Sequence, residues 1–408
     1  MKKNIRLVFS VLLSVLALSA CNSTYEESKG LTCAENGIEE ICFPEVGLEE
    51  KTLKYSKGSL GDNGGTNNSM LPFDTDKFSG KIEDIFYAGD NRILVYADSL
   101  CLYDMEEQNI VGEFSINEGR VVEREFFSTT DGYAMVGVIY GDSSDSLSSS
   151  GRTIKCWLFD KNFKCWKTID MVDLILKEED FMVFAAAVSQ DSKKLGIVGN
   201  NALYLYDIET DTLRQVFDYN KTDYADIVMV NSVGFIEHDE KLVFTGMATN
   251  LENSENIPIY GLISVEGKQP VCHKVTEYEL TDEMIIQDDE IWFPEAFDKA
   301  TGKMLVTNTN GEIMRIVNFE GEDTGADGIF GSDCGEHMAT IEWVSEQGCW
   351  RVRIYEAFNG ELRHEQMIKL DKQGYAAIIC KVRILDERNE CIVVAGKNQE
   401  TQIFSFFF

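Results

Sequence analysis

Residues 183–217 read VFAAAVSQDSKKLGIVGNNALYLYDIETDTLRQVF, and they predict four short strands separated by the polar turns SQDSKK, NN and ETDT. In the third predicted strand the side chains alternate between two faces, with Leu203 and Leu205 on one and Tyr204 and Tyr206 on the other. A helix would instead repeat its apolar residues at three and four positions. The stretch therefore predicts a four-stranded antiparallel meander.

The same pattern recurs along the chain. Segments that align on the third predicted strand start at residues 100, 154, 202, 259, 312, 351 and 401, and the copy at 312 begins just after the hairpin signal Asn310-Gly311. Four strands repeated every 40–55 residues or so are typical of a β-propeller, in which radial packing buries both faces of each sheet. We predict an all-β fold, a seven-bladed β-propeller of four-stranded antiparallel blades over residues 51–408. An eight-bladed ring that uses residues 48–80 is the alternative.

The repeats resemble those of WD40-like propellers in their order of strand, charged turn, strand, turn and then the motif Leu-Tyr-x-Tyr-Asp at 203–207. The resemblance covers roughly residues 80–408 and is one of pattern. The Gly-His opener and the Trp-Asp dipeptide of that family occur nowhere in the chain. The resemblance therefore implies a divergent bacterial propeller.

Two further elements are expected around these repeats. The seventh repeat reaches Phe408 in its third strand, so we predict that a strand near 48–57 (LEEKTLKYSK) pairs with Phe404–Phe408 and closes the ring. Residues 170–180 (DMVDLILKEED) predict a helix that connects the second and third repeats.

The first residues have the pattern of an export signal. Lys2, Lys3 and Arg6 precede an uncharged run of 14 residues, Leu7 to Ala20, which is too short to span a bilayer comfortably. The run ends in Leu18-Ser19-Ala20-Cys21, which resembles the lipobox of bacterial lipoproteins. The resemblance implies cleavage before Cys21, a diacylglyceryl group on its sulfur and a further acyl chain such as palmitate on its amine. The alternative is an ordinary secretory signal cleaved after Ala20.

This leader predicts the location of the protein. We expect a signal peptide at 1–20, a flexible tether at 21–50 that reaches roughly 30 Å, and a lipid anchor that holds the body to the membrane or envelope on its extracytoplasmic face. Two acyl chains anchor a protein stably where one does so only marginally.

Ten cysteines follow Cys21. Cys33 and Cys42 enclose a short loop and are the best candidates for a disulfide, whereas Cys156 and Cys165 flank a predicted hairpin whose register would have to shift for them to pair. The others lie singly among apolar strand residues and are expected to be buried thiols. The chain has no Cys-x-x-Cys and its four histidines are scattered, so neither a metal site nor another cofactor is expected.

The charge excludes one class of partner. Lysine and arginine number 37 against 70 acidic residues, for a net charge of −33. A chain this acidic repels phosphate backbones, so we expect no nucleic-acid partner. The same charge favours solubility and a monomer.

The chain contains no nucleophile elbow (Gly-x-Ser-x-Gly), no His-Glu-x-x-His metalloprotease motif and no phosphate-binding P-loop. Long acidic or hydroxyl-rich inserts at 141–152, 218–227, 247–258 and 321–333 are expected on one face, because second-to-third and blade-to-blade loops emerge on the same side. Binding residues concentrate on loops held by a rigid scaffold. The candidate recognition residues are Asp142, Asp145, Tyr219, Tyr224, Asp323 and Asp327.

We therefore expect a membrane-anchored binding or scaffold module for an unknown protein, peptide or glycan ligand. One alternative is a surface glycan-active enzyme that uses a pair of carboxylates on that face. Another is an assembly factor that adds a strand at an exposed blade edge.

Overall fold

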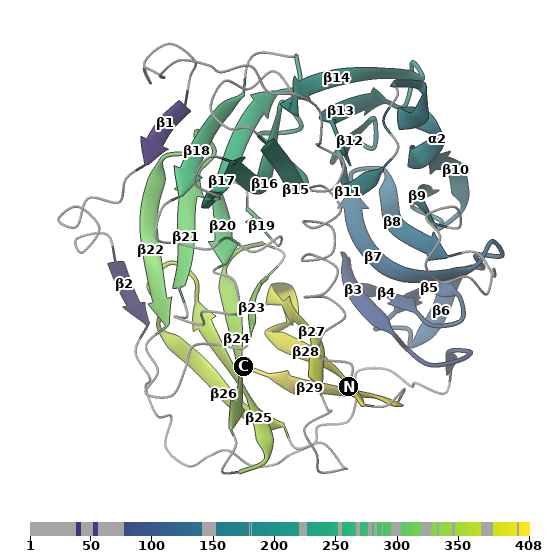
Figure 1. The fold of residues 1–408 in the computed structure, drawn as a ribbon. Coiled ribbons are helices and arrows are strands. Elements are labelled where there is room, and N and C mark those ends of the chain that lie inside the picture. Colours follow the sequence, from purple (N-terminus) through teal and green to yellow (C-terminus); the bar gives the residue numbers. More distant parts are fainter. Residues whose placement is uncertain are drawn as a thin grey trace, which may run out of the picture. The chain divides into compact units, whose positions relative to one another are not determined.

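The computed structural model describes residues 38–41, 52–55, 77–140, 152–178, 180, 182–219, 227–251, 255–266, 270–275, 280, 284–287, 289–294, 303–319, 328–332, 334–344, 347–368, 378–397 and 400–408. Seven antiparallel sheets follow one another along this part of the chain and form a ring (Figure 1). The protein body is a seven-bladed β-propeller, as the repeats predicted.

Each blade is built from consecutive strands of the chain. The first blade contains β3 (Asp84–Gly89), β4 (Arg92–Tyr96), β5 (Leu100–Asp104) and β6 (Asn109–Phe114). The second contains β7 (Arg120–Thr129), β8 (Gly132–Tyr140), β9 (Arg152–Asp160) and β10 (Cys165–Asp170). The third contains β11 (Val183–Val188), β12 (Lys194–Gly199), β13 (Ala202–Asp207) and β14 (Thr212–Asp218).

The next two blades contain β15 (Ile227–Ile236), β16 (Lys241–Asn250), β17 (Glu255–Ser264) and β18 (Val271–Val275), and then β19 (Ile285–Ile286), β20 (Glu290–Pro294), β21 (Lys303–Asn308) and β22 (Ile313–Phe319). The last two contain β23 (Gly328–Gly331), β24 (His337–Val344), β25 (Cys349–Glu356) and β26 (Leu362–Ile368), and then β27 (Ile378–Leu385), β28 (Glu390–Lys397) and β29 (Glu400–Phe407).

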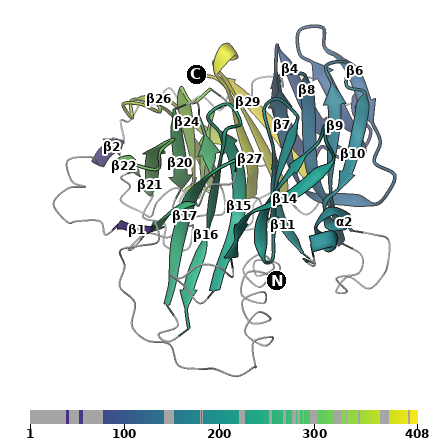
Figure 2. The ribbon, with the colours of Figure 1, turned by 90° about the horizontal axis from the view of Figure 1, so that it is seen from above.

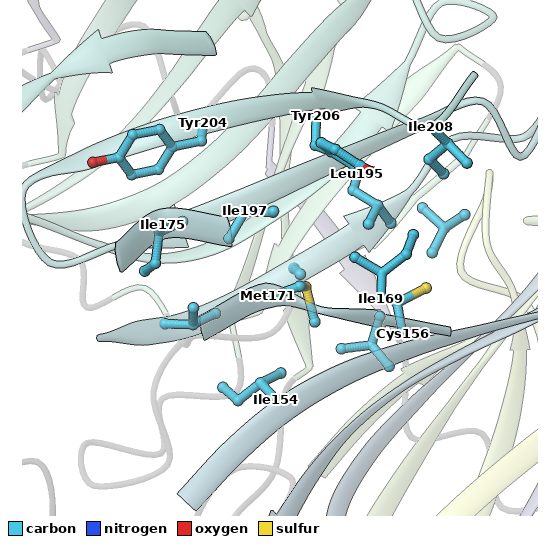
Figure 3. Close-up of a cluster of buried hydrophobic side chains, with 14 of the residues drawn as sticks. Ile154, Cys156, Ile169, Met171, Ile175, Leu195, Ile197, Tyr204, Tyr206 and Ile208 are labelled. Atoms are coloured by element: carbon cyan, nitrogen blue, oxygen red, sulfur yellow. The ribbon is translucent and has the colours of Figure 1, made fainter. Parts of the chain in front are cut away.

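The hydrophobic cores of the propeller lie between blades. Seven clusters of buried side chains occur among the described residues, and each joins two neighbouring blades. Figure 3 shows the cluster between the second and third blades, where Cys156 and Ile169 face Leu195 and Ile197. Because seven sheets share seven interfaces, the ring closes with seven blades and the eight-bladed alternative is wrong.

The first strands of several neighbouring blades contact one another, as β3 contacts β7, β11 contacts β15 and β27 contacts β3. These strands therefore line the inner side of the ring, and later strands of each blade lie farther out, as β14 does relative to β11 (Figure 1). Figure 2 shows the same ring from its side. Both faces of a blade pack against neighbouring blades, so nearly every residue of β12 and β13 is buried.

An aspartate ends the third strand in each of the first three blades. Asp104, Asp160 and Asp207 each accept hydrogen bonds from backbone N–H groups of the turn that follows, at 2.8–3.0 Å. A carboxylate at this position satisfies turn donors that no strand reaches. This contact explains why Asp closes the Leu-Tyr-x-Tyr-Asp motif.

A short helical segment precedes the third blade, as predicted for residues 170–180. It consists of α2 (Met171–Ile175), which Asp170 caps, and the 3₁₀ turn η4 (Leu176–Glu178). Asp180 follows, fully buried, and accepts hydrogen bonds from the N–H groups of Asn200 and Asn201 at 3.1 and 2.9 Å. The helical segment thereby delivers the carboxylate that holds the predicted Asn-Asn turn.

None of the helices in the described part of the chain is long and apolar enough to cross a bilayer.

The predicted clasp between the N-terminal strand and the C-terminus is wrong. The segment β2 (Thr52–Tyr55) pairs in parallel with β22 of the fifth blade, and β1 (Ile38–Ile41) pairs in parallel with β18 of the fourth. Packing of the seventh blade against the first closes the ring instead, through Leu385, Ile392 and Val394. Outer blade edges all present the same backbone groups, so the strand pattern of residues 48–57 could not indicate which edge it joins.

The repeat at 312 is also placed differently from the prediction. In six blades the aligned segment forms the third strand, but in the fifth blade it forms β22, the fourth. The two-residue strand β19 adds one element before β20 and so shifts the count. The seventh blade has three strands among the described residues, and β29 is the third, as expected.

Candidate functional site

Most residues predicted to carry function lie outside the described residues. These are Cys21, Cys33, Cys42, Asp142, Asp145, Tyr224, Asp323 and Asp327. Their roles in lipid attachment, disulfide formation and recognition stay predictions.

Tyr219 is described, and it is not part of an exposed surface. Its side chain is 5% exposed, and its ring lies 5.3 Å from that of Phe217 in an edge-on contact. It belongs to the core between the third and fourth blades. The prediction that Tyr219 adds aromatic surface is wrong, because the chain turns the residue inward at the end of the third blade.

The cysteines mostly follow the prediction of buried thiols. Cys101, Cys156, Cys272, Cys349 and Cys391 are buried. Cys165 is half-buried and Cys156 faces Ile169 across the hairpin, so these two do not pair. Cys334 is the exception, since it is free and exposed.

The turns between first and second strands contact one another from blade to blade. Thr130 of the second blade donates its N–H to the carbonyl of Gln190 in the third at 2.8 Å. Gln190 in turn donates its own N–H to Asp239 of the fourth blade at 2.8 Å. Between the seventh and first blades, Arg388 donates to the side chain of Asn91 at 3.1 Å. These contacts fix one face of the ring, so equivalent turns lie at equivalent heights.

One of these inter-blade contacts gathers groups that bind metals or exchange protons. The turn between β23 and β24 supplies Cys334 and Glu336, and β24 begins with His337. The 3₁₀ turn η7 (Asp386–Arg388) of the seventh blade supplies Asp386. The Cys334 thiol donates to Asp386 Oδ2 at 2.6 Å, and His337 Nδ1 lies 2.8 Å from Asp386 Oδ1. We call this set of four residues the turn cluster.

The local sequence explains the shape of the cluster. Gly335 has a positive φ of 74° between Cys334 and Glu336, a conformation that glycine adopts at no steric cost. A Cβ atom there would lie 2.7 Å from the side-chain oxygen of Gln287, a residue of the fifth blade. Gln287 also donates to the carbonyl of Ser332 at 3.1 Å. The turn is therefore held in place from the blade before it as well as by Asp386.

Burial differs strongly among the four side chains. Cys334 and Glu336 are exposed, whereas the side chains of His337 and Asp386 are 12% and 4% exposed. Burial and the Asp386 carboxylate raise the pKa of Cys334 to about 12. A thiol with such a pKa is protonated at neutral pH and is not an activated nucleophile.

The donor atoms of Cys334, Glu336 and Asp386 all lie within 4.8 Å of one another. The spacing Cys334-x-x-His337 is the one local signal of this site in the sequence, and it is neither a Cys-x-x-Cys motif nor a pair of histidines. Asp386 lies 52 residues after Cys334, and only the packing of two blades brings it near. No spacing rule would have found it.

The described structure resembles known propellers. No protein-family model matches the chain, and no curated protein matches it. Among solved structures, the β-propeller domain of Cps50 (Swd1) from Myceliophteria thermophila has a TM-score of 0.52 at 11% identity, over 81% of this chain and 98% of that one. The Dos1 propeller has a TM-score of 0.46 at 12% identity, over 81% of this chain and 80% of that one. At such low identity the likeness to the Cps50 domain shows a β-propeller fold and no particular activity.

Proposed function

We propose that this protein is a lipid-anchored extracytoplasmic module whose propeller binds a ligand on the face opposite the inter-blade turn contacts. The anchor is proposed from the leader, which ends in Leu18-Ser19-Ala20-Cys21. The recognition face is proposed from one structural observation, the unequal length of the hairpins that border it.

Hairpins of the second and fourth blades are longer than that of the third. Strands β8 and β9 have nine residues each and β16 and β17 have ten, whereas β12 and β13 have six. The first turns of these three blades are hydrogen-bonded to one another, so the extra length projects at the other end. Three extra residues add about 10 Å. The two long hairpins therefore rise on either side of the Asn200–Asn201 turn.

The ends of these hairpins are where the predicted recognition loops begin. Cross-strand pairing continues to Tyr140 opposite Arg152 in the second blade and to Asn250 opposite Glu255 in the fourth. Paired strands hold a loop rigidly at its base, and binding residues concentrate on loops of this kind. This arrangement supports a binding role at the sites of the inserts 141–152 and 247–258.

The edge strands restrict where the proposed anchor lies. β1 begins 17 residues after Cys21 and pairs with the edge of the fourth blade. A chain of that length spans at most about 60 Å. The outer edge of the fourth blade would then stay within that distance of the membrane surface.

The anchor is tested by Cys21→Ser in the full chain, expressed in a bacterial host fed a labelled fatty acid. We expect the variant to lose the label and to leave the membrane fraction while its circular dichroism remains that of a β protein. Cys165→Ser is the matched control and should keep both label and location. A Cys21→Ser protein that stays in the membrane fraction would contradict the proposed anchor.

The recognition face is tested by shortening the hairpin of the second blade, with Ile139 joined to Thr153 through a two-residue turn. The turn contacts on the opposite face are untouched, so the ring should fold. Glycan and peptide arrays probed with both proteins should yield a ligand whose affinity falls by about tenfold or more on shortening. Equal binding by the two proteins would contradict this placement.

A further inference from the structure

We propose that the turn cluster binds a divalent transition-metal ion, with Zn²⁺ as the preferred ion. Cys334, Glu336 and Asp386 are the ligands, and His337 holds Asp386 in position. The ion would join the sixth blade to the seventh.

The donor set indicates the class of metal. Cysteine sulfur is a soft ligand that Mg²⁺ and Ca²⁺ do not favour, and its combination with carboxylate oxygens is found in zinc sites. Zinc binding requires the thiolate, so the proton that Cys334 shares with Asp386 leaves to solvent when the ion binds. A water molecule would complete a four-coordinate site with three protein ligands.

The distances suit a tetrahedral ion after a small movement. Zn–S and Zn–O bonds of about 2.3 and 2.0 Å place neighbouring ligand atoms roughly 3.5 Å apart. The three donor atoms already lie within 4.8 Å of one another. Cys334 and Glu336 are exposed, whereas the side chain of Asp386 is nearly buried. The two exposed side chains can therefore adjust around the fixed one.

His337 acts on the site through Asp386. Its Nδ1 lies 2.8 Å from Oδ1, which leaves Oδ2 directed at the sulfur of Cys334. The ring of Phe408 contacts the imidazole edge-on, with the ring centres 4.9 Å apart. A partner outside the ligand sphere that orients a ligand typically contributes 10–100-fold to metal affinity. His337 is therefore a positioning residue.

Features of the turn independent of the donors also favour a preformed site. Gly335 between Cys334 and Glu336 has a positive φ, and Gln287 holds the start of this turn through the carbonyl of Ser332. The backbone N–H of His337 donates to the Ser332 side chain at 3.1 Å, and the Ser332 N–H donates back to the His337 carbonyl at 3.0 Å. The backbone that carries two of the ligands would not have to be ordered by the ion itself, which lowers the entropic cost of binding.

The test uses the full chain, stripped of metal with a chelator and then incubated with Zn²⁺ alone. Elemental analysis after gel filtration should find one zinc per chain that is lost in Cys334→Ser. Co²⁺ in place of zinc should give a thiolate-to-metal charge-transfer band that is likewise absent from that variant. Cys165→Ser, which changes the other accessible described thiol, should behave as the wild type.

Glu336→Gln keeps the test decisive if Cys334→Ser proves unstable, because Glu336 is exposed and its replacement should not affect folding. We expect its zinc affinity to fall by about tenfold or more. Glu361→Gln, an exposed acidic residue of the same blade, should leave affinity unchanged. Failure of the wild type to retain zinc, or equal affinity in Cys334→Ser and the wild type, would overturn the proposal.

Discussion

Arg383 of the seventh blade donates its Nε hydrogen to the carbonyl oxygen of Ile85 in the first blade, at 2.9 Å. Its Nη2 also lies 3.9 Å from Oδ1 of Asp84, which is 3% exposed. Asp84 in turn lies 3.7 Å from Arg124 of the second blade. One buried carboxylate thus lies between guanidinium groups of two other blades, at the junction where the last blade meets the first.

Replacing Arg383 with methionine should weaken this junction. Methionine keeps much of the apolar stem but removes the hydrogen bond to Ile85 and the charge beside Asp84. We expect the free energy of unfolding to fall by about 1–3 kcal/mol, as measured by urea denaturation. Arg363→Met is the control, because Arg363 is 44% exposed and pairs with Glu356 within its own blade. Exposed pairs contribute about 1 kcal/mol at most, so equal losses in both variants would contradict the assigned role.

Gly311 should not tolerate a side chain. Its φ is +84°, and a Cβ atom would lie 2.6 Å from Leu262 Cδ1 and 2.7 Å from His273 Nε2 of the fourth blade. Backbone strain and the clash together predict a loss of about 2–4 kcal/mol for Gly311→Ala. Gly348→Ala is the matched control, since its φ of +62° is similar but nothing lies within 4 Å of the added carbon. Thermal or urea unfolding of both variants should show the smaller effect at Gly348; the reverse order would refute the close contact.

Asp104 should make the free energy of unfolding depend on pH in the acid range. Hydrogen bonds from the backbone N–H groups of Glu107 and Glu106, with help from Arg92, keep its pKa below the usual 3.8 against the opposing effect of burial. A pKa lowered by folding stabilises the protein fully above the unfolded value, and this contribution is lost as the pH falls through the folded value. Asp104→Asn keeps an acceptor but has no charge to lose. We expect its stability to fall less steeply than that of the wild type below about pH 4.

Urea unfolding at several pH values between neutral and acid would measure that difference. Glu361→Gln is the control, because its side chain is 61% exposed and caps no turn in the described residues. Parallel pH profiles of the wild type and Asp104→Asn would count against the turn contact.

The blades themselves could be predicted because their causes are local. Alternation of side chains in residues 202–207, the Asn200-Asn201 turn and the Asn310-Gly311 turn depend on neighbours in sequence, and the structure has a hairpin at both turns. The helical segment before the third blade is equally local, since its N-cap, Asp170, directly precedes it in the sequence. Local patterns of this kind can be read from one sequence.

Features that depend on packing between blades could not be predicted. Phe217 lies near Tyr219 in the sequence, but the burial of Tyr219 also requires the fourth blade to pack against it. The edge chosen by β2 and the approach of Asp386 to Cys334 likewise follow from how blades sit side by side. The last two are contacts between residues that lie 52 and more than 260 positions apart.

Because the hydrophobic cores lie between blades, the repeats can diverge in sequence from one another during evolution. Phe217 packs on Phe244 of the next blade, with ring centres 5.4 Å apart, so each must fit its partner and need not resemble its counterpart in other repeats. Seven interfaces can then change their side chains separately, one matched pair at a time. Repeats copied from a common ancestor would drift apart in this way while the ring kept its geometry. Residues such as Asp104, Asp160 and Asp207, whose turn contacts lie within one blade, would stay alike.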